Sequence, residues 1–257
     1  NTATSGTITT GSFSARVDFT TGSAPFYIAA KDIDGDGKTD IAVGNSSGNS
    51  VSVFRNTATA GSITSSSLAA KVDFATGANP YGVDMSDVVG DGKMDLVVAN
   101  YNSNNISVFR NTAVAGSITS TSFSSATTFA TAAQPTFLNT GDIDGDGKMD
   151  IAVSCYTSGA VSVFRNTAIS GTIGAGSLAT KVDFATGNNP NYVAVADIDG
   201  DSKLDLVYSN YTVGSISVLR NTATSGTITS ASFSTKVDLI TGSAPYTIAL
   251  GDLDGDG

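Results

Sequence analysis

The architecture of this chain follows from nine residues, Asp32-Ile33-Asp34-Gly35-Asp36-Gly37-Lys38-Thr39-Asp40. Asp-rich, glycine-spaced runs of this kind recur every 55 residues, beginning at Asp32, Asp87, Asp142, Asp197 and Asp252. The same interval separates the prolines, at Pro25, Pro80, Pro135, Pro190 and Pro245, and the Arg-Asn-Thr-Ala segments that begin at Arg55, Arg110, Arg165 and Arg220. A fixed period of this length indicates a repeat protein whose structural unit is one repeat.

The boundaries of the repeats follow from the Asn-Thr-Ala segments. Counted from each of these, the 257 residues divide into repeats 1–55, 56–110, 111–165 and 166–220, followed by a partial repeat, 221–257. We expect residues 1–257 to form a single domain or a fragment of one.

Each period predicts four short strands. Apolar and polar residues alternate with a period of two, as in Val51-Ser52-Val53-Phe54-Arg55, and this period is typical of strands. From Pro25 onward we expect strands at residues 26–31, 40–44, 51–55 and 68–74. Small residues in the first segment indicate the crowded innermost strand, and the mixture of charged and apolar residues in the fourth indicates a solvent-facing outer edge.

A four-stranded antiparallel sheet of about 50 residues cannot bury both of its faces alone, whereas sheets stacked radially as blades cover one another. The sequence therefore predicts an all-β fold, a β-propeller of four-stranded antiparallel blades with a 55-residue repeat. We expect about five blades in this chain, as a ring of their own or as part of a larger one. In the fifth repeat we expect a first strand at residues 246–250.

The Asp-rich runs have the composition of cation-binding loops. In each complete run, carboxylates at positions 1, 3, 5 and 9 and the backbone carbonyl at position 7 can converge on one hard cation. Ligands that are all oxygen favour calcium over transition metals. The candidate ligands, each Lys through its carbonyl, are Asp32, Asp34, Asp36, Lys38 and Asp40; Asp87, Asp91, Lys93 and Asp95; Asp142, Asp144, Asp146, Lys148 and Asp150; Asp197, Asp199, Asp201, Lys203 and Asp205; and Asp252, Asp254 and Asp256.

The runs are not identical, and their differences predict different affinities. Val89 replaces the Asp at position 3 of the second run, so we expect the weakest of the intact loops there. Ser202 replaces a glycine of the fourth run without removing a ligand. An EF-hand is excluded because Val43 stands where that loop needs a bidentate Glu. The runs contain 18 of the 23 Asp residues, so five calcium ions would cancel the formal net charge of −10.

The composition excludes several function classes. The chain contains no His, Glu or Trp, which removes the Ser-His-Asp and zinc-hydrolase templates, and Cys155 has no His to activate it. We therefore expect no enzymatic activity. With 13 Lys and Arg residues against 23 Asp, the chain would repel nucleic acid. No apolar run approaches the ~18 residues of a membrane helix, so we expect no membrane insertion.

Two motifs resemble a known family, the FG-GAP or VCBS-type repeats, which also build the calcium-binding propeller of integrin alpha chains. One is Asp-Xaa-Asp-Gly-Asp-Gly-Xaa-Xaa-Asp followed by an apolar strand, as at residues 142–153; the other is Phe-Xaa-Thr-Gly-Xaa-Xaa-Pro, as at residues 19–25 and 74–80. The resemblance covers the whole chain. It implies a propeller, usually of seven blades, with calcium between the first two strands of each blade, and secreted or cell-surface roles in adhesion and recognition. It implies no particular ligand.

Three hypotheses about function remain open at this point. The first is a calcium-stabilised extracellular adhesion or structural protein of the cell surface, with self-association into a surface filament as one variant. The second is a lectin-like propeller that binds glycans or proteins at its mouth, and the third is an accessory domain of a larger secreted protein. Aromatic residues that follow the prolines bear on the second, although we expect them to pack between blades. They are Phe26, Tyr27, Tyr81, Phe137, Tyr192 and Tyr246.

Overall fold

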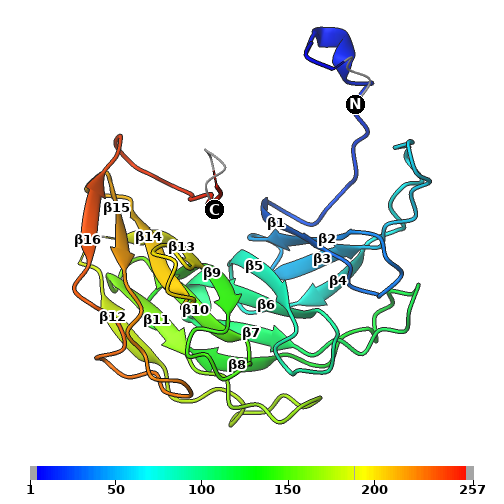
Figure 1. Ribbon diagram of the computed structural model, residues 1–257. Helices are drawn as coiled ribbons and strands as arrows, with labels where there is room; N and C mark the ends of the chain where they lie inside the picture. Colours follow the sequence, from blue (N-terminus) through cyan, green and yellow to red (C-terminus); the bar gives the residue numbers. More distant parts are fainter. Residues whose placement is uncertain (1–4, 188, 253–257) are drawn as a thin grey trace.

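The computed structural model describes residues 5–187 and 189–252, which form four antiparallel sheets of four strands each (Figure 1). The first two sheets contain β1 (Pro25–Lys31), β2 (Asp40–Asn45), β3 (Ser50–Phe54) and β4 (Val72–Ala75), and β5 (Pro80–Ser86), β6 (Asp95–Asn100), β7 (Asn105–Phe109) and β8 (Thr127–Ala130). The other two contain β9 (Pro135–Gly141), β10 (Asp150–Cys155), β11 (Ala160–Phe164) and β12 (Val182–Ala185), and β13 (Pro190–Ala196), β14 (Asp205–Asn210), β15 (Ser215–Leu219) and β16 (Val237–Ile240).

Within each sheet the strands follow one another in sequence order, and the sheets stand side by side as the blades of an arc (Figure 1). The first strands lie innermost and contact one another in turn, β1 with β5, β5 with β9, and β9 with β13. Two short 3-10 helices, η1 (Thr10–Ser12) and η2 (Tyr101–Ser103), complete the described elements. Neither these nor any other described segment forms a helix that could cross a membrane.

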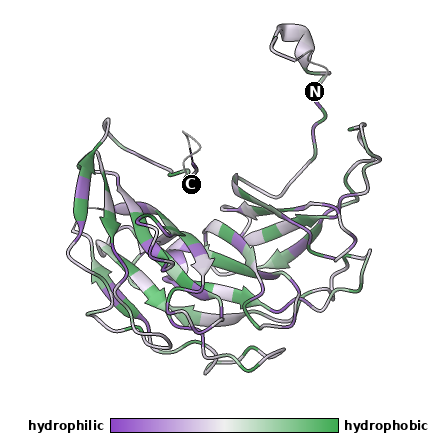
Figure 2. Ribbon diagram, viewed as in Figure 1, coloured by the Kyte–Doolittle hydropathy of each residue, from purple (hydrophilic) through white to green (hydrophobic). Residues whose placement is uncertain are grey.

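The core lies between blades rather than within them. Three clusters of buried residues fill the three junctions of the arc, and hydrophobic residues lie mainly along the strands (Figure 2). Every residue of the second strands β6, β10 and β14 is buried. Aromatic pairs seal the outer side of two junctions: Phe74 meets Phe123 edge-on at 5.0 Å, and Phe184 meets Phe233 at 4.8 Å.

The outer faces of the first and fourth blades carry exposed apolar side chains. Leu239 occupies in the fourth blade the repeat position that Phe74 and Phe184 occupy in theirs, yet it is 50% exposed, whereas those two are 7% and 8% exposed. Val237, two residues before it on the same face of β16, is 60% exposed, and Ile28 on β1 is 61% exposed. These two faces therefore present the apolar half of a blade junction to solvent.

The sequence-based expectations hold for the sheet order and the inner strands, and two details differ. The outer strand of the first blade is β4, shorter than the expected residues 68–74; Leu68 makes only an isolated bridge with Asn56. Residues 246–250, expected as the first strand of a fifth blade, form no strand. Each inner strand pairs with the second strand of its own blade, and among the described residues none pairs as a strand with residues 246–250.

Candidate metal centres

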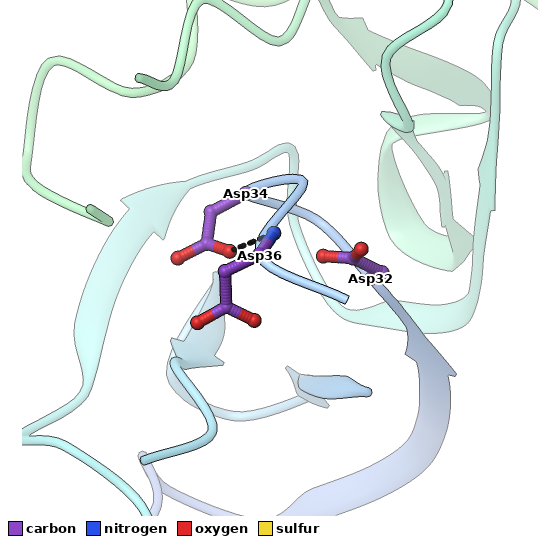
Figure 3. Close-up of side chains that lie close together, drawn as sticks. All are labelled: Asp32, Asp34 and Asp36. Carbon is purple, nitrogen blue, oxygen red and sulfur yellow. Dashed lines mark hydrogen bonds between the residues drawn. The ribbon is translucent and has the colours of Figure 1, made fainter. Parts of the chain in front are cut away.

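The Asp-rich runs form the loops between the first and second strands of each blade. Three groups of carboxylates have ligand atoms that all lie within 4.8 Å of one another: Asp32, Asp34 and Asp36; Asp142, Asp144 and Asp150; and Asp197, Asp199 and Asp205. Figure 3 shows the first group, with Asp34 and Asp36 on one side of the loop and Asp32 on the other. Oxygens bound to one calcium ion at about 2.4 Å lie at most about 4.8 Å apart, so each group has the spacing of a calcium site.

Backbone hydrogen bonds to the first carboxylate fold the loop. Asp32 accepts hydrogen bonds from the backbone N–H groups of Gly35 and Gly37, both at 2.8 Å. Gly35 and Gly37 have φ angles of 72° and 85°, a region that favours glycine. In the fourth loop Ser202 stands in the place of Gly37 with a φ of 67° and donates its N–H to Asp197 at 2.8 Å. Ser202 therefore keeps the hydrogen bond that Gly37 makes, but its backbone is strained because residues with side chains rarely adopt this φ.

The Asp at position 9 holds the loop against the third strand. One oxygen of Asp150 accepts N–H groups from Ile143 at 3.0 Å and Asp144 at 3.2 Å, and the other accepts that of Asn166 at 2.7 Å. Asp40, Asp95 and Asp205 make the equivalent bonds to the residue after their Arg. All four side chains are buried, and burial raises the pKa of Asp150 to about 7 and that of Asp95 to about 6.

An arginine reaches each loop from the end of the third strand. Arg55 donates from Nε to Asp34 at 2.8 Å and from Nη2 to Asp36 at 3.2 Å, and Arg165 donates to Asp144 at 2.9 Å. Arg220 pairs with Asp199 and with Asp201 in the same way. From the sequence alone these arginines were identified only as markers of the period. Their constant distance from the Asp runs was the signal that could have identified them as partners of positions 3 and 5.

The second loop lacks a group of three carboxylates within the described part of the chain, because Val89 supplies no oxygen. Asp87 folds the loop by accepting N–H groups from Asp91 at 2.9 Å and Gly92 at 2.8 Å. Arg110, deprived of a position-3 partner, bonds to Asp91 with both Nε and Nη2. The loop thus keeps its shape while offering fewer cation ligands.

The structure brings together only part of each predicted ligand set. The first group gathers positions 1, 3 and 5, whereas the third and fourth loops gather positions 1, 3 and 9, so Asp40, Asp146 and Asp201 lie outside the groups. The lysines at position 7 donate their backbone N–H to the position-5 Asp of the same loop; they are Lys38, Lys93, Lys148 and Lys203. In the fifth run, Asp252 is described, and Asp254 and Asp256 lie outside the described residues.

The donor chemistry of the three groups fits a hard divalent cation. Every ligand is a carboxylate oxygen, and three such charges at this distance repel one another strongly unless a cation lies among them. The neighbouring arginine supplies one positive charge but only from one side. Calcium is the cation that an oxygen-only set on a flexible, glycine-containing loop suits best.

The next blade holds the second and third loops from outside. Ser170 donates its hydroxyl to the Gly90 carbonyl at 2.7 Å, and Ser225 donates to that of Gly145 at 2.9 Å. One level deeper, the buried Asn166 amide donates to the Val88 carbonyl of the preceding blade at 2.7 Å. Asn111 and Asn221 make the equivalent bonds to Ile33 and Ile143. The first three loops therefore belong to junctions between blades as well as to their own blades.

Comparisons with known proteins agree with this arrangement. A family model described as FG-GAP-like repeat matches residues 32–98, 87–153, 142–208 and 197–257. Each of the first three matches begins at one Asp-rich run and extends through the next run into the strand after it. No curated protein matches the chain.

Two solved structures share the fold. One, described as a functionally unknown protein from Desulfotomaculum acetoxidans DSM 771, is 13% identical with a TM-score of 0.59, covering 91% of this chain and 61% of that one. The other, BBS1N in complex with ARL6DN, soaked with mercury, is 12% identical with a TM-score of 0.53, covering 87% of this chain and 56% of that one. The chain thus spans less than two thirds of either structure, and at these identities the likeness concerns the fold alone.

Proposed function

The chain belongs to the FG-GAP-like repeat family, and we propose that it is a calcium-stabilised adhesion or structural module that works outside the cell. The observation that carries the proposal is the three groups of carboxylates, each in a loop between the first and second strands of a blade. Because the next blade holds the first and third loops by hydrogen bonds from Asn111 and Asn221, calcium in these loops would stabilise the packing of one blade on the next.

An extracellular setting is supported by the chemistry of the loops. Calcium sites of extracellular modules typically work with dissociation constants near 10⁻⁴–10⁻³ M, a concentration of free calcium found outside cells. A chain with a net charge of −10 gains most from cations at such concentrations, since they relieve its self-repulsion.

A binding or structural role rather than catalysis is supported by how the carboxylates are used. The sequence contains no His or Glu, and the buried Asp40, Asp95, Asp150 and Asp205 are engaged by backbone N–H groups. A general base needs a free lone pair directed at a substrate proton. We therefore propose a non-enzymatic module.

Calcium-dependent unfolding tests the proposal. Saturating calcium should raise the free energy of unfolding by about 2–3 kcal/mol at a hundred times the dissociation constant, because the ion binds folded loops in preference to the unfolded chain. Urea unfolding in calcium and in chelator measures the difference. Asp144→Asn should reduce it, and the matched Asp18→Asn, which changes an exposed carboxylate outside the loops, should leave it intact. Unfolding of the unmodified protein that ignored chelator would refute the proposal.

The exposed outer faces of the arc support an assembling, structural form of this function. We propose that copies associate through these faces into a surface filament, because Leu239 offers the contact that Phe184 makes inside the arc. Negative-stain images of the protein in calcium should contain ordered fibres. Discrete, uniform particles at all concentrations would refute the filament and leave the proposed adhesion module unaffected.

A further inference from the structure

A pocket lined by tyrosines lies at the inner end of the arc, away from the calcium loops. Its volume is about 250 Å³, and its walls include Tyr81, Tyr101, Tyr156, Tyr211 and Tyr246. Three of these follow the second strands at the 55-residue interval, and the other two follow prolines whose spacing is a multiple of that interval. Four successive repeats therefore contribute to one pocket, although the sequence analysis singled out only Tyr81 and Tyr246.

The pocket and the Asp-rich loops occupy opposite ends of the inner strands. β5 begins at Pro80, next to Tyr81 of the pocket, and ends at Ser86, next to Asp87 of the second loop. Seven residues of strand extend for about 20 Å. A substitution in the pocket therefore leaves the loop carboxylates and their contacts unchanged.

The tyrosine rings hold one another in place. Tyr81 is stacked between Phe26, at a centroid distance of 4.3 Å, and Tyr101, at 4.6 Å. Tyr211 meets Tyr156 edge-on at 6.1 Å and Tyr246 at 6.2 Å. The Tyr101 hydroxyl also donates to Gln134 Oε1 at 2.9 Å. These contacts fix the walls before any ligand arrives, which reduces the entropy lost on binding.

The phenol groups gather around the same space. Burial raises the pKa of Tyr101, and the neighbouring Tyr81 and Tyr156 phenols raise it further. Within the described residues, the Tyr81, Tyr156 and Tyr211 hydroxyls make no recorded hydrogen bond. A phenol hydroxyl both donates and accepts, so these groups offer unused hydrogen-bonding capacity at the wall of a rigid aromatic pocket.

We propose that this pocket binds a neutral saccharide of one or two sugar units. Its volume accommodates about one ring, Tyr and Asn191 line it, and no charged side chain does. Sugars carry several hydroxyls, which pair with the phenol hydroxyls at the ring edges, and their C–H groups tolerate the aromatic edges beside them. The proposal deepens the adhesive function, on which it rests for its biological role, because it gives the module a ligand class.

A cationic ligand fits the pocket less well than a sugar. Binding of a quaternary ammonium group depends on open aromatic faces within about 6 Å of the charge. Both faces of Tyr81 are covered by Phe26 and Tyr101, so its edge and hydroxyl are what remain for a ligand. Tetramethylammonium is accordingly the competing probe.

The test is a titration of the calcium-loaded protein with glucose, galactose, mannose and N-acetylglucosamine. Calorimetry and tyrosine fluorescence measure the binding. The chain has no Trp, and five of its eight Tyr line the pocket, so the fluorescence reports mainly on this site. Tyr156→Phe removes one hydroxyl and should weaken binding roughly three- to tenfold. Tyr211→Ala should abolish it. The matched control is Tyr27→Phe, which removes a hydroxyl from a separate cavity between the first strands. This variant should bind the sugars as the unmodified protein does.

Each outcome decides the matter. Binding of at least one of these sugars that is lost in Tyr211→Ala and kept in Tyr27→Phe supports the site. Absence of binding by all four sugars, or binding unaffected by the pocket substitutions, overturns it. Tyr211-dependent binding of tetramethylammonium without any sugar would also overturn it and identify a cation pocket. Because calcium-dependent stability is measured separately, a protein that binds calcium but no sugar refutes this inference and leaves the proposed function standing.

Discussion

Identical aspartates do different work according to their position in the loop. Asp32 turns the loop by accepting N–H groups from its own glycines, whereas the buried Asp150 fastens its loop to the third strand. Asp34 and Asp144 instead face an arginine. A single loop thus uses one residue type for folding, for attachment to the blade and for cation binding, and only the last of these requires calcium.

Restoring the missing carboxylate of the second loop is expected to create a stronger site. Val89→Asp adds a carboxylate at position 3, near Arg110. In the first loop Arg55 pairs with the Asp at this position, Asp34. Calorimetric titration should therefore detect one additional or tighter calcium site. Without calcium the variant should be less stable by about 1–3 kcal/mol, because the replaced Val89 is only 1% exposed.

Val89→Asn is the matched control for that prediction, since it changes the polarity and size in a similar way without adding a charge. It should lose stability and gain little calcium affinity. An unchanged titration in Val89→Asp would contradict the assignment of position 3 as a ligand.

The single cysteine should be inert in the folded protein. Cys155 lies on β10 with no exposed surface, and burial raises the pKa of its thiol to about 11. Near pH 8 the folded protein therefore holds almost no thiolate, whereas the unfolded chain has a thiol pKa of about 8.5 and reacts readily. As the pH rises above this unfolded value, the raised pKa costs the folded state stability.

Labelling with a thiol reagent near pH 8 measures this difference, with the denatured protein as the positive control. Reaction should require unfolding of the blade, and calcium should slow it further. Rapid labelling of the native protein, with or without calcium, would show that β10 is more accessible than the structure has it.

At the scale of elements, one asparagine in each of the second, third and fourth blades bonds to the preceding blade. The Asn166 side chain is buried and donates to the Val88 carbonyl of the preceding blade and to the Met149 carbonyl of its own. Asn56 occupies the same repeat position in the first blade, but its side chain donates only to the Thr39 carbonyl at an exposed site. Comparing substitutions of these two asparagines therefore distinguishes the contribution of the hydrogen bond between blades from that of the bond within a blade.

Asn166→Ala should therefore cost about 2 kcal/mol more than Asn56→Ala in the free energy of unfolding, because it leaves a buried carbonyl of the neighbouring blade unpaired. Urea unfolding of the two variants under the same conditions provides the measurement. Equal losses would mean that the bond between blades contributes nothing beyond the local one.

The inner elements were predictable from sequence, whereas the outer ones were only partly so. Proline, the Asp-rich loop and alternating apolar residues mark the first three strands, and β1 to β3 lie within one residue of the expected ranges. The fourth strand was expected to begin at Leu68 because alternation continues there, but pairing with β3 supports only Val72–Ala75. The sequence pattern contains no information on where the partner strand ends.

The candidate site was predictable in its residue types but not in its geometry. Recurrence identified the carboxylates, since their spacing is independent of the rest of the fold. Which three of them meet depends on the path of each loop, and this differs between the first loop and the third. The arginines and the tyrosines of the pocket are contributed by other strands or other repeats, so their roles became evident only when the blades were assembled.

At the scale of the whole molecule, stability is a sum over neighbouring blades. Each of the three buried clusters joins two adjacent sheets. In such an array the contacts of any blade are limited to its neighbours, and the faces at the ends of the array stay exposed unless another unit covers them. The apolar residues on the outer face of the fourth blade are therefore a consequence of the repeat, because every blade carries the residues of a junction.

The filament hypothesis makes these exposed faces the site of association between copies, and one charged substitution tests it. Leu239→Lys introduces a charge into the outer face of the fourth blade at the position of the blade contact, where the side chain is 50% exposed, so a single copy should still fold. Contact between two faces would bury that charge at a cost of several kcal/mol, which should reduce the size of the assemblies seen by sedimentation in calcium. Ile169→Lys is the matched control, since Ile169 is 80% exposed on a loop of the third blade away from that face. Association that is equally sensitive to both substitutions, or to neither, would place the contact elsewhere on the molecule.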